Sequence, residues 1–95
     1  SVPPERLRRF VATHLGPILD RPDLVDTLAA WYGEKGSRAA VARRLHVHRN
    51  SVGYRIGRIR ELLGADPFDP WTALQLRAAL EALAILTALD RADAE

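Results

Sequence analysis

Apolar residues in this chain recur mostly at spacings of three and four, which place them along one face of an α-helix. The clearest case is the run Val52, Ile56, Ile59 and Leu63, which steps by four, three and four. Pro and Gly residues separate such runs from one another and leave no convincing strand. The 95-residue sequence therefore predicts an all-α fold of about five helices in a single domain, 1–95.

Helix-terminating residues set the expected bounds of these helices. Pro3-Pro4-Glu5 opens the first helix and Gly16-Pro17 ends it, while Ser37 is a typical N-cap residue for the third. The other predicted helices cover about 23–34, 37–45, 48–63 and 70–89, and residues 91–95 form a frayed tail. The fifth helix is apolar nearly all round, so we expect it at the centre of the core or half committed to a partner. Trp31 and Trp71 are both expected in the core.

Charge is distributed very unevenly along the chain. The segment from Lys35 to Arg60 carries eight Lys or Arg residues and no Asp or Glu, whereas the rest carries six basic and twelve acidic residues. The formal net charge of +2 therefore combines +8 in this segment with −6 elsewhere. Because the same segment has helical apolar spacing, its charge lies on folded structure, which is typical of a face that binds nucleic acid.

The third and fourth predicted helices lie inside this basic segment and are joined by a turn of about three residues. Such a pair with a basic second helix is typical of a DNA-binding helix-turn-helix. Ala42 occupies the small position where the two helices cross, and Leu45, Val47 and Val52 occupy the apolar positions around the turn. His46 stands where many such motifs have Gly, a position that often requires a left-handed backbone.

The outer face of the fourth helix is the part expected to meet DNA, because the N-terminal turn of a recognition helix usually reaches the base edges. Arg can bind guanine, Asn can bind adenine and hydroxyl groups adapt to either base. The residues predicted to contact bases are Arg49, Asn50, Ser51 and Tyr54. The residues predicted to contact phosphates are Lys35, Ser37, Arg38, Arg43, Arg44, His48, Arg55 and Arg58.

Four of these outer positions have a second interpretation. Tyr54 can hydrogen-bond a phosphate or pack against a neighbouring helix, and His48 can cap the fourth helix. Gly53 and Gly57 each cost a helix roughly 1 kcal/mol, yet they would let its backbone approach a DNA groove closely. Close packing between helices, or chance, explains the two glycines equally well.

The run from Ser37 to Ile56 closely resembles the C-terminal helix-turn-helix of the PucR/CdaR family, bacterial transcription regulators named after purine catabolism and sugar-diacid utilisation. The signature is Leu45-His46-Val47-His48-Arg49-Asn50-Ser51 followed by Tyr54-Arg55-Ile56, and Arg58-Ile59-Arg60-Glu61-Leu62-Leu63-Gly64 continues it. The resemblance covers roughly residues 17–90. Ser51-Val52 stands where family members usually have Thr-Leu, and Gly53 and Gly57 are less typical of the family.

The resemblance implies a module at the C-terminal end of a larger regulator, behind a sensory and dimerising region. A chain that starts at Ser1 and contains no Met fits that expectation. The resemblance also implies a Fis-like arrangement, in which a dimer presents two recognition helices to successive major grooves. The expected partners are double-stranded DNA, a second copy of the chain and an upstream ligand-sensing region of the same protein.

Other classes of function find little support in the sequence. The chain has no Cys, His46 and His48 lack a third metal ligand at a sensible spacing, and no catalytic set has supportive spacing, so we expect no metal, no cofactor and no enzyme. No apolar run approaches the roughly 20 residues of a membrane span and no signal peptide is evident, which favours a cytoplasmic protein without a membrane partner.

Two other binding functions remain as alternatives. The main one is a helical protein-interaction module that docks on transcription or signalling machinery through the apolar fifth helix. An RNA-binding helical domain is the second, although it would favour stacking aromatic residues, of which the basic segment has only Tyr54.

Overall fold

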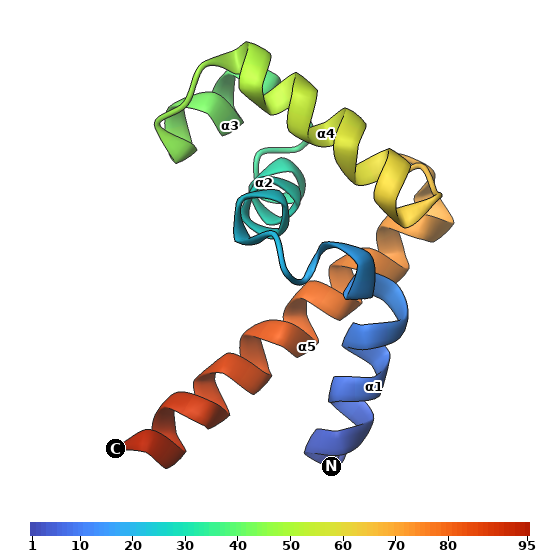
Figure 1. The fold of residues 1–95 in the computed structure, drawn as a ribbon, viewed down its shortest axis with the longest axis vertical. Helices are drawn as coiled ribbons and strands as arrows, with labels where there is room; N and C mark the ends of the chain where they lie inside the picture. The colour runs from blue at the N-terminus through green and yellow to red at the C-terminus, as the bar shows by residue number, and fades with distance from the viewer. The chain divides into compact units, whose positions relative to one another are not determined.

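A computed structural model describes all residues 1–95 as five α-helices and one short 3-10 helix, with no strand. In chain order these are α1 (Pro4–Leu15), η1 (Gly16–Ile18), α2 (Pro22–Gly33), α3 (Arg38–Leu45), α4 (Arg49–Leu63) and α5 (Pro70–Ala94), as Figure 1 shows. The all-α prediction with five helices is confirmed. The chain forms two compact units, one of Ser1–Gly16 with Pro67–Glu95 and one of Pro17–Asp66, whereas the sequence predicted a single domain.

The helix ends lie close to the predicted ones because short-range signals set them. Pro occupies the first turn of α1, α2 and α5, where a missing backbone N–H costs no hydrogen bond. The carboxylate of Asp69 accepts a hydrogen bond from the backbone N–H of Thr72 at 3.0 Å and caps α5. Gly64 ends α4 in the left-handed conformation, with φ 63°.

The unit of residues 17–66 is a cluster of three helices in which α2, α3 and α4 all pack against one another. Its fully buried side chains include Leu24 and Leu28 from α2, Val41 from α3, and Val52 and Ile59 from α4. Each side chain of this size stabilises the fold by about 1.5–3 kcal/mol when it is removed from water. The helical spacing of these residues thus fixes which face of α4 is turned inward.

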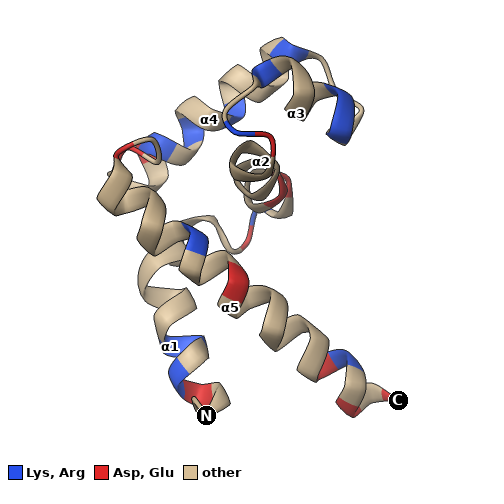
Figure 2. Ribbon diagram, turned by 180° about the vertical axis from the view of Figure 1, so that it is seen from behind, with Lys and Arg blue, Asp and Glu red and all other residues tan.

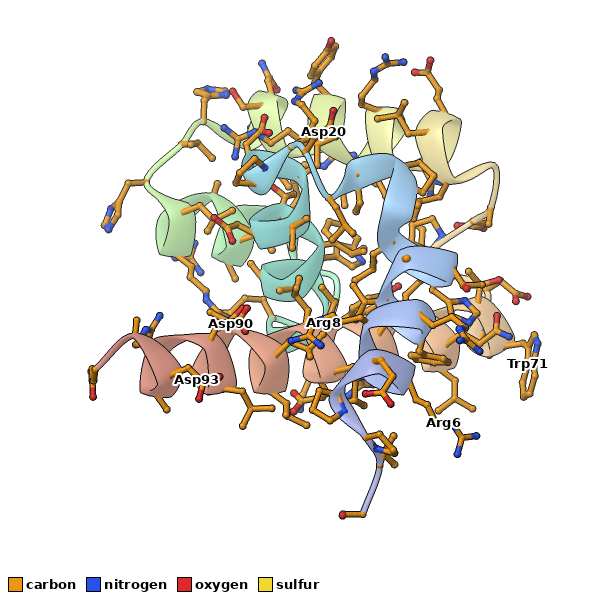
Figure 3. The ribbon with its side chains drawn as sticks, turned by 60° about the horizontal axis from the view of Figure 1, so that its bottom comes forward. Arg6, Arg8, Asp20, Trp71, Asp90 and Asp93 are labelled. Atoms are coloured by element: carbon orange, nitrogen blue, oxygen red, sulfur yellow. The ribbon has the colours of Figure 1, made fainter.

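The second unit consists of α1 and α5, which run in opposite directions and diverge toward the two chain termini (Figure 1). The buried residues of these helices are Val11 and Leu15 on α1 and Leu76, Ala79, Ala82 and Leu86 on α5. An exposed ion pair at 3.7 Å joins Arg8 to Asp90, whose side chains are labelled in Figure 3. The buried residues occupy only one side of α5.

Two expectations for α5 are wrong. The helix continues to Ala94 instead of ending near Leu89, because residues 90–94 contain neither Gly nor Pro and include two Ala, the best helix former. Trp71 is not a core residue: it is 66% exposed, and its ring points outward in Figure 3. Trp31, by contrast, is half-buried on α2.

The expectation that no segment is apolar enough to cross a membrane also needs correction. α5 has 25 residues, and an 18-residue window within it has a mean hydropathy of 1.4, with 22% of that window buried. One helix that meets these criteria is weak evidence for a membrane span, because helices of water-soluble proteins can meet them as well. The finding does establish that α5 carries more apolar surface than the chain itself covers.

Candidate nucleic-acid interface

The helix-turn-helix is formed by α3, the turn at 46–48 and α4. His46 adopts the left-handed conformation expected from the motif, with φ 58° and ψ 43°. The N–H of His46 donates to the carbonyl of Arg43 at 3.3 Å, and the N–H of Val47 donates to the carbonyl of Ala42 at 3.0 Å. These two hydrogen bonds close the end of α3, so the chain turns into α4 within three residues.

Side-chain caps fix the start of both helices. The hydroxyl of Ser37 accepts a hydrogen bond from the N–H of Ala40 at 3.2 Å, and Nδ1 of His48 accepts one from the N–H of Asn50 at 3.0 Å. The predicted caps at Ser37 and His48 are therefore confirmed, and the second one orders the first turn of α4.

The helix α4 has a buried face and an open face. Val52 and Ile56 lie on the buried face, with exposed fractions of 0% and 4%. Arg49 and Asn50 are exposed in the first turn, and Tyr54 is 71% exposed on the same open side. The ring of Tyr54 is therefore not packed between helices, which removes one of the two interpretations that the sequence left for it.

Two glycines shape the outer side of α4 in different ways. The guanidinium of Arg38, which comes from α3, lies beside Gly53, and a Cβ at that glycine would be 3.1 Å from Arg38 Cζ. A Cβ at Gly57 would have no heavy atom within 4 Å. Gly53 thus makes room for a cation that reaches from α3 to α4. Close packing between helices does not explain Gly57, because that position faces open space.

Arg55 reaches from α4 to α2. Its Nη1 donates to the hydroxyl of Thr27 at 3.3 Å, and its Nε lies 4.0 Å from the carboxylate of Asp23. The side chain of Arg55 is 23% exposed, and Thr27 is fully buried. Arg55 therefore connects the predicted recognition helix to the helix behind it. Its predicted phosphate contact remains a prediction.

A small charge cluster surrounds Asp23 at the start of α2. Arg21 donates from Nε and Nη2 to the two carboxylate oxygens at 3.3 Å each. These hydrogen bonds, helped by the charges of Arg21 and Arg55, lower the pKa of Asp23 below its ordinary value, although partial desolvation opposes them. The same hydrogen bonds and charge attraction raise the pKa of Arg21. The carboxylate is thus held ionised between two cations.

Neither acceptor of Arg55 was predicted from the sequence. Thr27 lies between Leu24 and Leu28 in the apolar stripe of α2, and a hydroxyl at such a position needs a hydrogen-bond partner once it is buried. A buried Thr can donate its hydroxyl proton to a carbonyl of its own helix, which leaves the hydroxyl oxygen able to accept a hydrogen bond from another side chain. Thr27 does so by donating to the carbonyl of Asp23 at 2.7 Å. The position of Thr27 in the sequence therefore indicated that such a donor lies nearby.

The other predicted phosphate contacts come from α3, α4 and the turn before α3, and Figure 2 shows the basic residues spread along α3 and α4. Arg44 lies 3.9 Å from Glu34, and Arg58 lies 3.4 Å from Glu61. Such exposed pairs contribute about 0–1 kcal/mol, so the two guanidinium groups can exchange a carboxylate for a phosphate at little cost. Lys35 lies in the turn itself, with φ 55°.

The predicted base contacts thus lie in the first two turns of α4, and the guanidinium of Arg38 reaches this helix from α3 beside Gly53. Two of the predicted contacts direct their guanidinium groups to α2: Arg55 contacts Thr27 and Asp23, and Arg44 lies beside Gly33. No group of three or more His, Cys, Asp or Glu residues is placed to hold a metal ion.

A three-helix unit with a left-handed turn residue between α3 and α4, and a basic open face on α4, defines a helix-turn-helix DNA-binding domain. Residues 24–82 match the family model described as the PucR C-terminal helix-turn-helix domain. The chain belongs to this family, as its resemblance to PucR/CdaR regulators predicted, and the family is one of DNA-binding transcription regulators and not of enzymes.

The relatives with descriptive names are also regulators. The chain is 35% identical over 83 residues to the purine catabolism regulatory protein of Bacillus subtilis. This alignment covers 83% of the chain and 16% of that protein. The chain is 45% identical over 56 residues to the carbohydrate diacid regulator of Escherichia coli, covering 53% of the chain and 14% of that protein. An uncharacterised protein of Mycobacterium tuberculosis is 42% identical over 74 residues, covering 74% of the chain and 18% of that protein.

The chain therefore spans less than a fifth of the length of these three relatives. No solved structure shows significant similarity to it.

Proposed function

We propose that the chain is the sequence-specific DNA-binding output domain of a bacterial transcription regulator, that α4 enters the major groove, and that two copies act together on one operator. The observation that carries this proposal is the open first turn of α4, where exposed Arg49 and Asn50 follow a His48 cap and the guanidinium of Arg38 reaches the same helix beside Gly53. Membership of the PucR family supports the regulatory role.

Base recognition falls to the side chains at the start of α4. Arg49 can bind guanine O6 and N7, Asn50 can bind adenine N6 and N7, and Ser51 can hydrogen-bond either base. Tyr54, one turn further along and 71% exposed, reaches the same groove through its hydroxyl. Gly57 lies beyond it in open space, which lets the helix backbone come close to the groove wall.

The phosphate contacts fix the position of α4 in the groove. Arg38, Arg43 and Arg44 lie on α3, which crosses the DNA backbone in this arrangement, and Lys35 and Ser37 lie just before it. His48, the N-cap residue of α4, and Arg58 on α4 add two further phosphate contacts. Arg55 serves mainly to hold α4 against α2, because Thr27 and Asp23 already engage its guanidinium.

Two copies are needed because one helix-turn-helix reads only a few base pairs, and a dimer joins two half-sites about 34–36 Å apart. In the proposed full regulator, an upstream ligand-sensing region controls the spacing or affinity of the pair. The relatives are several times longer than this chain, which leaves room for such a region in them. DNA as the target places the regulator in the cytoplasm.

The direct test is selection of duplexes from a randomised pool, followed by fluorescence anisotropy with the selected and a scrambled duplex. Asn50→Ala should lower affinity for the selected duplex by about 1–3 kcal/mol and reduce the preference over the scrambled one. Arg58→Ala should weaken binding to both duplexes equally and reduce the log–log salt slope by about one unit. Arg91→Ala, at the exposed end of α5, is the matched control and should change neither. Binding without any sequence preference would contradict the proposal.

A further inference from the structure

The guanidinium of Arg38 lies flat against α4 at Gly53. A Cβ at Gly53 would be 3.1 Å from both Cζ and Nη1 of Arg38 and 3.5 Å from Nη2. A guanidinium that points end-on has its Cζ farther away than its nearest nitrogen, as Arg44 does at Gly33, where the distances to a Cβ would be 3.7 Å for Cζ and 2.6 Å for Nη1. Arg38 instead turns its planar face to the helix backbone. We refer to the space over Gly53 that this guanidinium occupies as the Gly53 seat.

The N–H donors of the Arg38 guanidinium have no acceptor within the chain. Its side chain is exposed and makes no hydrogen bond, and no carboxylate lies within 4.0 Å of it. By contrast, Arg44, Arg55 and Arg58 each pair with a carboxylate. A guanidinium carries its donors at the edge of its plane, so one that lies flat on α4 leaves them directed along the helix surface. Arg38 is therefore in contact with α4 without being neutralised there.

The place of Arg38 in its helix indicates that its ligand is an anion. Arg38 is the first residue of α3 and Arg49 is the first residue of α4, and neither helix has an acidic residue in its first turn. The helix dipole disfavours cations at an N-terminus, so Arg38 does not stabilise α3. Gly53 lies four residues after Arg49, so the seat places a second cation on the side of α4 that carries Arg49. The two charges repel each other, and a phosphate beside them removes that repulsion.

We propose that Gly53 is a positioning residue for DNA binding, which seats the Arg38 guanidinium on α4 so that Arg38 holds a DNA phosphate beside the recognition helix. The edge of a guanidinium can donate two parallel hydrogen bonds to one phosphate. Because the group is in place before DNA arrives, less side-chain freedom is lost on binding. The inference deepens the proposed function and rests on it: it gives Gly53 a role in DNA binding through Arg38, whereas Gly57 acts through the helix backbone alone.

A double-mutant cycle in fluorescence anisotropy, with the whole chain and the selected duplex, tests the seat. Arg38→Ala should lower affinity about 10-fold and reduce the log–log salt slope by about 0.9. Gly53→Ala should lower affinity about 3-fold or more and also reduce the slope, because its Cβ displaces the guanidinium. In the Arg38→Ala background, Gly53→Ala should have no further effect. Gly57→Ala is the matched control: its Cβ would have no heavy atom within 4 Å, so its effect should be the same in both backgrounds.

A measurement without DNA separates the seat from the proposed function. ¹⁵N relaxation of Arg38 Nε should show restricted side-chain motion in the parent chain and faster motion in Gly53→Ala, whose Tm should not fall because Ala favours a helix. Additive effects of Gly53→Ala and Arg38→Ala on affinity, or an unchanged salt slope in Gly53→Ala, would overturn the proposal. A chain that binds the duplex with a freely moving Arg38 would overturn the seat alone. A restricted Arg38 in a chain that binds no DNA would sink the proposed function, and the phosphate contact with it.

Discussion

Replacing Arg55 with alanine removes the side chain that connects α4 to α2. The Arg55 guanidinium donates to the buried Thr27 hydroxyl at 3.3 Å and lies 4.0 Å from Asp23. A hydrogen bond that involves a charged group contributes about 1.5–3 kcal/mol, and the length of this one places it at the lower end. Thr27 keeps its own hydrogen bond to the carbonyl of Asp23, so the substitution leaves no buried donor without an acceptor. The expected loss is therefore about 1.5 kcal/mol.

Thermal unfolding followed by circular dichroism measures this loss. For a chain of this size, about 1.5 kcal/mol corresponds to a fall in Tm of about 6–12 °C. Arg58→Ala is the matched control, since Arg58 lies one turn further along α4 and pairs only with the exposed Glu61 of the same helix. Its cost should stay within about 0.5 kcal/mol. The two variants should rank the other way in DNA affinity: Arg58→Ala should lower the affinity more than Arg55→Ala does.

A double-mutant cycle isolates the contact itself. Thr27→Val keeps the shape of the buried side chain and removes the acceptor of the Arg55 hydrogen bond. The two substitutions should be coupled by about 1 kcal/mol. Strictly additive effects, or an Arg55→Ala variant as stable as Arg58→Ala, would refute the reasoning that Arg55 holds α4 in place.

Three further predictions follow from single side chains. Gly57→Ala should stabilise α4 by up to about 1 kcal/mol in thermal unfolding, because the added Cβ meets no other atom. The same variant should bind DNA more weakly in fluorescence anisotropy. An unchanged affinity would argue against a close approach of the α4 backbone to the groove. Asp69→Ala should cost about 1 kcal/mol in urea unfolding through loss of the α5 cap, whereas Asp69→Asn should be nearly neutral. The folded-state pKa of Asp23 is lowered, so its contribution to stability is present above the unfolded pKa of about 3.9 and is lost as the pH falls through the folded value. Asp23→Asn should flatten the acid side of the Tm-versus-pH curve, and an unchanged curve would contradict the Arg21 contact.

The features that the sequence predicted correctly depend on short-range signals. The Ser37 cap, the Pro residue that opens α1 and the stripe from Val52 to Ile59 each follow from a few neighbouring residues, and the structure has all of them. The motif at the turn was specific enough to predict the left-handed conformation of His46 as well.

The features that the sequence did not predict depend on which elements meet in space. Nothing local distinguishes the Trp71 side of α5 from its buried side, since both are apolar, so only the packing against α1 shows which is exposed. The direction of Arg55 likewise depends on Thr27, which lies 28 residues away in the chain. The division into two compact units is a third feature of this kind.

The most direct test of the central claim is an NMR titration of the ¹⁵N-labelled chain with a selected duplex, read residue by residue. The account predicts that the largest amide shift changes fall in the first two turns of α4, around Asn50 and Tyr54, and along α3. Changes on α5 should be small, because none of the proposed contacts lies on that helix. Shift changes concentrated on α5, or none at all under low-salt conditions, would contradict the claim that the open face of the helix-turn-helix binds DNA.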